Sequence, residues 1–186
     1  TDNAPHRGAL SFARGRQIHR TQAFVRLRAL VFDPSAMNAT LFRHAINLWP
    51  PYLFAGIHVT AISADYRAIR VELRQRLWNV NYVRTHFGGN LFSMTDPFWM
   101  LALLKNLGPA YFVWDKAGEI EFIKPGKAVV ATEFKLSQAL VDELRQQASD
   151  GNKVLRWFEN EIIDAQGDVV ARVRKQVYIR LKPDQR

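Results

Sequence analysis

Two adjacent glycines, Gly88 and Gly89, stand where a polar loop is predicted to enter an apolar helix over residues 90–107. Glycine lets a ligand approach the backbone closely, and free N–H groups at a helix start can stabilise a negative oxygen. Acyl transfer produces such an oxyanion. Asp96 follows Gly89 by seven residues, about two helical turns. An acid on an apolar helix must be paired, desolvated or reached by water, so Asp96 is a candidate base or nucleophile.

The same residues also have a purely structural interpretation. Asp96 followed by Pro97 matches a helix N-cap with proline at the first helical position. Gly88–Gly89 matches an ordinary tight turn. Residue chemistry alone leaves both interpretations open.

Several other catalytic schemes lack the residues that they need. The sequence contains no Gly-x-Ser-x-Gly elbow of serine hydrolases, no P-loop and no dinucleotide-binding glycine fingerprint. Cysteine is absent, which excludes disulfides, thiolate metal ligands and a cysteine nucleophile. The histidines lack the i, i+4 spacing of a helical metal pair, so we expect no metal site.

The formal net charge of +9 is uneven along the 186 residues. Residues 1–30 hold six arginines and a single acid, Asp2. We interpret residues 1–35 as a basic N-terminal extension and residues 36–186 as one domain. Because no recognition motif accompanies the arginines, a solvated tail is favoured over a nucleic-acid arm. Positive potential would also attract a polyanion such as coenzyme A.

The sequence predicts neither a membrane span nor a secretory signal. The longest apolar run, Phe98 to Leu104, is far shorter than the ~18 residues that a span needs. No charged start followed by an apolar segment is present. Together with the absence of cysteine, these patterns lead us to expect a cytoplasmic protein.

Periodicity predicts an antiparallel sheet wrapped around one long buried helix, which is an α+β fold. The expected helices are 38–49, capped by Ser35 or Asn38 and stopped by Pro50 and Pro51, then 90–107, and 138–148, capped by Ser137. The expected strands are 57–63, 67–74, a pair at 111–114 and 119–123 joined near 116–118, then 128–136, 153–163 and 168–181.

Residues 81–96, NYVRTHFGGNLFSMTD, resemble the loop and central helix of hotdog-fold thioesterases, especially the phenylacetate-pathway branch. That family's pattern reads approximately N-x-x-G-T-x-H-G-G, followed seven residues later by Asp or Glu. The matching positions here are Asn81, Thr85, Gly88, Gly89 and Asp96. With the flanking segments WPPYLFAGI and EIEFIKPGKAVV, the resemblance covers about residues 39–182.

Two loop positions depart from the pattern. Arg84 replaces the family's usual glycine, and Phe87 stands where many members have histidine, with His86 one residue away. Pro97 is a further departure, which predicts a bent helix or a late helix start because its ring clashes with the Ser93 carbonyl.

The resemblance implies a hotdog domain over residues 36–186 that assembles as a homodimer or homotetramer with its active site at the interface. The substrate would be an acyl-CoA or acyl-carrier thioester, and no cofactor is implied beyond coenzyme A as part of that substrate. The N–H groups of Gly88 and Gly89 would polarise the thioester carbonyl. Asp96 would attack directly or activate water on a substrate held by the partner subunit, and Asn81 would orient the water or the loop.

The remaining loop residues are candidates for binding the substrate. Thr85, His86 and Phe87 belong to the loop itself, whereas Arg84 and Lys124 are candidates for the coenzyme A phosphates. For the last two a solvated surface position is the simpler interpretation.

Two other functions stay open. A non-catalytic hotdog module that binds an acyl ligand, with a regulatory role, is favoured by the altered loop and the basic arm. A dehydratase of another hotdog class would need a catalytic histidine, for which His86 is the sole candidate in the loop.

Overall fold

The computed structural model describes residues 37–183, so the predicted extension at residues 1–35 lies outside the described part. In chain order the elements are α2 (Ala39–Leu48), α3 (Pro50–Ala55), β1 (Ile57–Ile62), β2 (Ala68–Arg74), α4 (Gly88–Ser93), α5 (Phe98–Leu107), β3 (Tyr111–Phe122), β4 (Val129–Lys135), α6 (Gln138–Gln147), β5 (Val154–Asp164) and β6 (Val169–Leu181). None of the described helices is long and apolar enough to cross a membrane.

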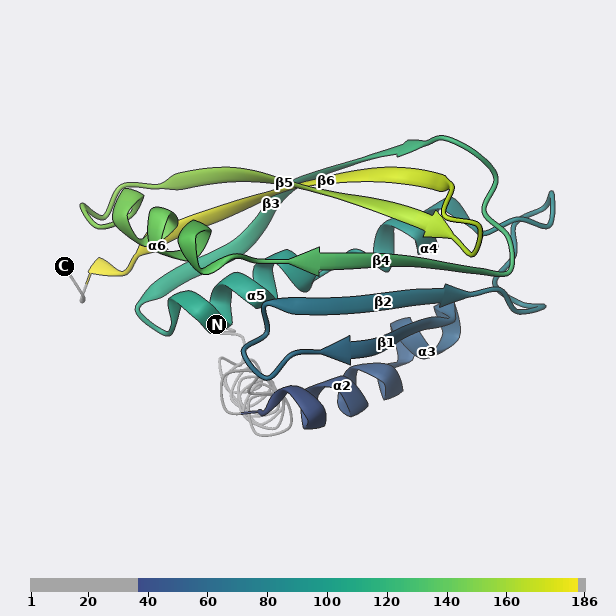
Figure 1. Ribbon diagram of the computed structural model, residues 1–186, viewed down its shortest axis with the longest axis horizontal. Coiled ribbons are helices and arrows are strands. Elements are labelled where there is room, and N and C mark those ends of the chain that lie inside the picture. Colours follow the sequence, from purple (N-terminus) through teal and green to yellow (C-terminus); the bar gives the residue numbers. More distant parts are fainter. Residues whose placement is uncertain (1–36, 184–186) are drawn as a thin grey trace, which may run out of the picture. The chain divides into compact units, whose positions relative to one another are not determined.

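The six strands form one antiparallel sheet in the order β1-β2-β4-β5-β6-β3 (Figure 1). The buried helix α5 packs on it through aromatic rings. Trp99 stacks on Phe158 of β5 with ring centroids 4.5 Å apart, and Phe98 lies 5.1 Å from Phe134 of β4. This is the predicted α+β arrangement of an antiparallel sheet packed on a buried helix, and that prediction is confirmed.

Side chains cap two of the helices as the sequence indicated. Asn38 accepts a hydrogen bond from the backbone N–H of Leu41 at the start of α2, and Ser137 does the same for Leu140 in α6. Pro50, which ends the first helix, also begins the short helix α3, which the sequence analysis did not predict.

The predicted helix over residues 90–107 is interrupted. Helix α4 ends at Ser93, and α5 begins only at Phe98, after a turn that contains Pro97. Proline has no N–H to donate to the Ser93 carbonyl, and its ring clashes with that carbonyl in a continuous helix. The late helix start predicted from Pro97 is therefore confirmed.

The predicted pair of strands at 111–114 and 119–123 is wrong. Residues Tyr111–Phe122 form a single strand, β3, that pairs with β6 along its whole length. A β-bulge between Asp115 and Ala117 replaces the predicted turn near Gly118. A bulge changes which residues face the core, so Asp115 and Gly118 both lie on the inner side of the sheet.

The two edges of the sheet differ. At β1, the Asn47 side chain of α2 accepts from the Val59 N–H at 2.7 Å and donates to the Val59 carbonyl at 3.0 Å. At the other edge, β3 pairs only with β6 among the described strands. A long unpaired edge is a site for pairing with another chain.

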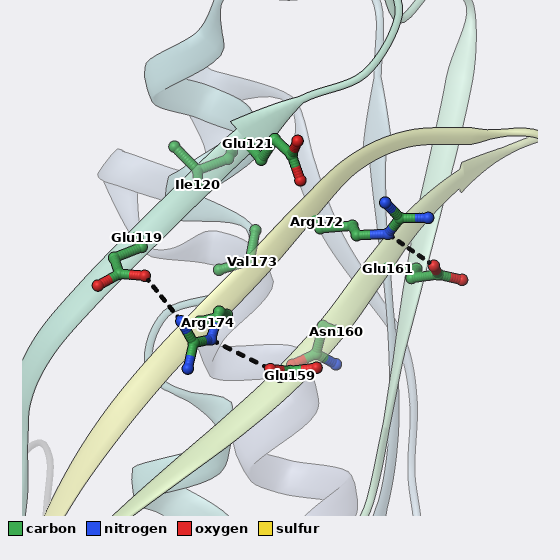
Figure 2. Close-up of a pocket in the computed structure, with 9 residues that line it drawn as sticks. All are labelled: Glu119, Ile120, Glu121, Glu159, Asn160, Glu161, Arg172, Val173 and Arg174. Carbon is green, nitrogen blue, oxygen red and sulfur yellow. Dashed lines mark hydrogen bonds and ion pairs between the residues drawn. The ribbon is translucent and has the colours of Figure 1, made fainter.

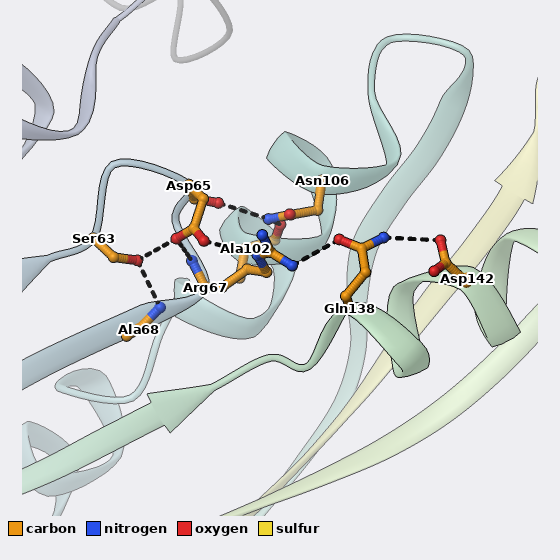
Figure 3. A network of polar contacts seen from close by, with 8 residues as sticks. All are labelled: Ser63, Asp65, Arg67, Ala68, Ala102, Asn106, Gln138 and Asp142. Carbon is orange, nitrogen blue, oxygen red and sulfur yellow. Dashed lines mark hydrogen bonds and ion pairs between the residues drawn. The ribbon is translucent and has the colours of Figure 1, made fainter.

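A polar network ties the β1–β2 turn to two helices (Figure 3). Asp65 accepts from the Ser63 hydroxyl at 2.5 Å and from the Arg67 backbone N–H at 3.1 Å. These bonds, with the Arg67 guanidinium, lower the pKa of Asp65 to about 2. Asn106 of α5 donates to the Asp65 carbonyl at 2.9 Å, and Arg67 donates to Gln138 of α6 at 2.6 Å. The network fixes the C-terminal end of α5, at Asn106, relative to the sheet.

Candidate functional site

The loop before α4 is organised by the side chain of Asn81. Its carboxamide oxygen accepts from the backbone N–H groups of Val83 at 3.1 Å and Thr85 at 2.9 Å. Its nitrogen donates to the Thr85 hydroxyl at 2.8 Å and to the His86 carbonyl at 3.2 Å. Because these four bonds use the amide fully, Asn81 orients the loop rather than a water.

This loop, the start of α4 and the β3–β4 connection enclose a pocket of about 400 Å³. Four predicted site residues from the loop and helix start lie around it, together with the predicted Lys124. The lining residues are Asn81, Thr85, His86, Gly88, Leu91, Phe122, Ile123, Lys124, Pro125 and Gly126. Its size falls in the range of small-ligand pockets, about 300–1,000 Å³.

The two glycines have different surroundings. Gly88, the first residue of α4, lines the pocket, and a Cβ at this position would lie 2.8 Å from the Phe122 ring. Gly89 lies beneath the ring of Phe87, which contacts the place where its Cβ would be. The first N–H groups of a helix have no partner within the helix. Because Gly88 lines the pocket and Gly89 does not, the Gly88 N–H is the candidate donor to a ligand oxygen.

His86 is a buried side chain with unused hydrogen-bonding capacity. It is 3% exposed, and within residues 37–183 neither ring nitrogen makes a hydrogen bond of good geometry. Burial lowers the pKa of His86, and the nearby backbone of Ala128 offsets this only in part. A neutral imidazole has one donor and one acceptor, and both ring nitrogens of His86 are buried in the pocket wall.

Arg84 does not line this pocket. Its backbone φ is +61°, in the left-handed region that favours glycine, which explains why the resembling family usually has glycine here. Arg84 borders a neighbouring hollow together with Arg76, Leu77 and Trp78. Phe87 borders a third hollow beside Phe54 and Trp78.

Lys124 lines the pocket, but its charge is already balanced. Its Nζ lies 2.7 Å from Asp164 Oδ2 and 2.6 Å from Asp168 Oδ2, and these two hydrogen bonds raise the pKa of Lys124. The pairing argues against the predicted contact with a coenzyme A phosphate.

Asp96 lies in the turn between α4 and α5 and is not among the residues that line the pocket. Its carboxylate makes no capping bond to α5, whose N-cap is Pro97, so the helix-cap interpretation is wrong. The side chain is 55% exposed, and its Oδ2 lies 3.7 Å from Lys175 Nζ of β6. The Tyr52 hydroxyl donates to the Asp96 carbonyl and holds the turn against α3.

A separate hollow of about 550 Å³ lies on the other face of β3, β5 and β6 (Figure 2). Both of its arginines are paired with glutamates, since Arg174 contacts Glu119 at 3.2 Å and Glu159 at 3.1 Å, and Arg172 contacts Glu161 at 3.2 Å. None of the predicted site residues borders it. Across the described residues, no group of three or more metal-ligating side chains gathers.

Sequence reasoning missed two charged residues beside Asp96. Lys175 and Asp115 face the core side of the sheet, with Nζ and Oδ2 3.3 Å apart. The sequence could have indicated Lys175, because the alternation of this strand predicts a buried apolar residue between the inward-facing Val173 and Val177. Asp115 could not be placed, because the bulge that follows it was interpreted as a turn.

Comparison with solved structures identifies the fold. A protein of unknown function from Pseudomonas aeruginosa, described as a probable thioesterase, superposes with a TM-score of 0.70 at 20% identity, over 78% of this chain and 97% of that one. PaaI from the phenylacetic acid degradation operon of E. coli gives 0.54 at 21% identity, over 77% and 94%. Mouse thioesterase superfamily member 2 gives 0.53 at 13%, over 75% and 96%.

These likenesses establish the hotdog thioesterase-like fold that the sequence resemblance implied. No curated protein sequence matches the chain. A family model, described as Domain of unknown function (DUF4442), matches residues 38–179. The match spans most of the chain, which therefore belongs to the DUF4442 family.

Proposed function

We propose that the protein hydrolyses acyl thioesters. The observation that supports the proposal is the pocket of about 400 Å³ where Gly88, the first residue of α4, and the buried His86 lie beside an apolar wall. The wall is formed by Leu91, Phe122 and Ile123. This combination suits a thioester, because its carbonyl oxygen needs a donor and its acyl chain needs apolar surface.

The chemistry needs one base or nucleophile and one oxyanion donor. Water or the Asp96 carboxylate attacks the thioester carbonyl, and the negative charge that develops on oxygen is stabilised by the Gly88 N–H. If water attacks, Asp96 accepts its proton. The carbon–sulfur bond then breaks, and the departing thiolate takes up a proton to become the thiol. When water attacks, Asp96 returns the proton that it accepted, and the other product is the carboxylic acid. When Asp96 attacks, the first product is an acyl anhydride of Asp96, which water hydrolyses to the carboxylic acid and the free Asp96 carboxylate. No bound cofactor takes part, and coenzyme A enters only as the thiol portion of the substrate.

An acyl-CoA or acyl-carrier thioester is the proposed substrate class. Arg84 and Arg76 border the hollow beside the loop, and the segment 73–95 contains three arginines and no acidic residue. A phosphate-bearing carrier would find a favourable potential along this segment.

We infer that the active unit is a homodimer, or a homotetramer built from dimers. The edge of β3 has no partner among the described strands, and pairing it with a second copy would remove an exposed edge. Large apolar side chains of the loop are also exposed, which is typical of an interface. They are Leu77, Trp78, Tyr82, Val83 and Phe87. Since Asp96 does not border the pocket of its own chain, a partner's Asp96 is the candidate to reach it.

The test is a hydrolysis screen of acyl-CoAs of graded chain length with detection of the free thiol. We expect thiol release that saturates with substrate and depends on chain length, because the pocket has a finite volume. Light scattering on the same sample should give an even oligomer. A monomer mass at micromolar concentration would contradict an interface site.

The oxyanion role predicts different effects for two variants of Gly88. Gly88→Pro removes the N–H at the first helical position, where proline is tolerated, and the extended Phe87 (ψ 125°) is compatible with a following proline. We expect kcat to fall by about 10²–10³-fold.

Gly88→Ala is the matched control for the added atoms. It introduces a Cβ against the same movable Phe122 ring but retains the N–H. We expect mainly a change in KM. Equal losses of kcat in both variants would show that crowding, not the lost donor, is responsible.

The second candidate function is a non-catalytic acyl-binding module. The ring of Phe87 fills the space beside Gly89 where a Cβ would be, and Gly89, one of the two predicted oxyanion donors, does not line the pocket. Binding of an acyl-CoA measured by calorimetry, with no thiol release from any chain length, would favour this function over hydrolysis.

A further inference from the structure

Lys175 is a charged residue on the core-facing side of β6. It is 6% exposed, and its inward neighbours Val173 and Val177 are fully buried. Taking an ammonium out of water has a large desolvation cost unless opposite charges accompany it. A lysine in this row therefore indicates a specific electrostatic role.

Two carboxylates from different elements surround this ammonium. Lys175 Nζ lies 3.3 Å from Asp115 Oδ2 of β3 and 3.7 Å from Asp96 Oδ2 of the α4–α5 turn. It also lies 4.8 Å from the centroid of the Phe92 ring, a cation–π contact. Gly118, opposite Lys175 in the sheet, leaves the required space, since a Cβ there would lie 2.6 Å from Phe92 Cζ.

Two carboxylates beside one ammonium leave an excess negative charge, which a proton can balance. The Asp96 and Asp115 carboxyl groups contact the same ammonium, so the charge of each acts on the other. Asp115 Oδ1 is buried and accepts no hydrogen bond in the described part of the chain. Burial raises the pKa of Asp115, Lys175 opposes this, and the charge and hydrogen bond of Asp96 raise it further. Lys175 is therefore the group that keeps the two carboxyl groups together at the surface of the sheet.

We propose that Lys175 is a positioning residue for Asp96, and that Asp115 is the second carboxyl group that holds the Lys175 ammonium in place. The inference rests on the proposed function, in which Asp96 acts on the thioester. Although the Asp96 side chain is 55% exposed, its carboxylate contacts the buried Lys175 ammonium on the side of the sheet. The titratable groups that face it are Asp115 of β3, Lys175 of β6 and Tyr52 of α3. Tyr52 stays neutral because burial, and then the charge of Asp96, raises its pKa well above the usual value.

The test is the pH profile of thioester hydrolysis by Lys175→Met in the full chain. Methionine keeps the length of the side chain but removes the charge that favours an ionised carboxylate. The acid limb of the profile is the range in which kcat/KM falls as the pH is lowered. We expect this limb to move to higher pH by about 1–3 units. At neutral pH kcat should fall more than KM changes, because substrate contacts are retained.

Lys135→Met is the matched control. Lys135 also forms an ion pair, with Glu133 at 2.8 Å, but its side chain is 79% exposed on β4. This variant should keep the wild-type profile. If Lys175→Met keeps the same profile as well, Lys175 has no positioning role and the inference is wrong.

A second variant covers the case in which Lys175→Met does not fold. Lys175→Met/Asp115→Asn removes the buried cation and its closest carboxylate together, which buried ion pairs tolerate better than the loss of one partner. Its acid limb should move in the same direction by less. A wild-type profile in the folded double variant would overturn the inference.

Carboxyl ¹³C NMR titration of the full chain separates this inference from the proposed function. We expect the Asp115 signal to report the linked charges, moving to higher pH in Lys175→Met and to lower pH in Asp96→Asn. If the protein hydrolyses no thioester but this linkage is found, the proposed function is wrong, whereas the electrostatic linkage of Lys175, Asp115 and Asp96 is confirmed. Independent titrations that do not respond to Lys175→Met would overturn the inference even in an active enzyme.

Discussion

Asp96→Asn is expected to lower the turnover of the proposed thioester substrate by at least about 10²–10⁴-fold, the usual contribution of a general base. Asparagine keeps the shape of the side chain but cannot accept a proton or attack a carbonyl as a carboxylate does. The fold should be retained, because Lys175 still has Asp115 at 3.3 Å as its counter-ion. Substrate binding should also survive, since the pocket and the Gly88 N–H are unchanged.

The measurement is kcat by thiol release, together with binding of an acyl-CoA by calorimetry. Asp142→Asn on α6 is a matched control, because its side chain is 56% exposed, close to the 55% of Asp96, and also contacts a cation, Arg145. It should leave turnover at the wild-type level. Comparable turnover in Asp96→Asn and wild type would mean that another residue is the base or nucleophile.

Most of the sheet could be predicted from the sequence because its strands alternate apolar and polar residues. Ile69, Val71 and Leu73 of β2 are all buried, as their spacing requires. Caps such as Asn38 and Ser137 act through local hydrogen bonds, which is why sequence alone places them correctly.

Features that depend on residues far apart in the chain were missed. Gly118 resembles a turn residue locally, but in the sheet it lies opposite Lys175 and makes room for the Phe92 ring. Local patterns also could not show that Asp96 and the pocket at Gly88 are separate, although both positions were singled out from their spacing. Their separation depends on the interruption at Pro97 and on the packing of α5.

That separation leads to the last prediction, which concerns dimers made from two different inactive chains. If each active site combines the Gly88 loop of one chain with Asp96 of the other, Asp96→Asn and Gly88→Pro impair the same site from opposite sides. A mixed dimer then contains one site with both changes and one site with neither. Random pairing of equal amounts should therefore restore about a quarter of wild-type activity, from two chains that are each nearly inactive alone.

The experiment co-expresses the two chains with different affinity tags, and native mass spectrometry measures the fraction of mixed dimers. The control pairs Asp96→Asn with the double variant Asp96→Asn/Gly88→Pro. Every site in these dimers lacks the Asp96 carboxylate, so no activity should be restored. No recovery in verified mixed dimers would mean that each chain builds its own site, which would require Asp96 to approach the pocket by a rearrangement of the α4–α5 turn. Recovery close to a quarter would instead explain why Asp96 is held by Lys175 and Asp115 at a distance from its own pocket, since its substrate would be bound by the other chain.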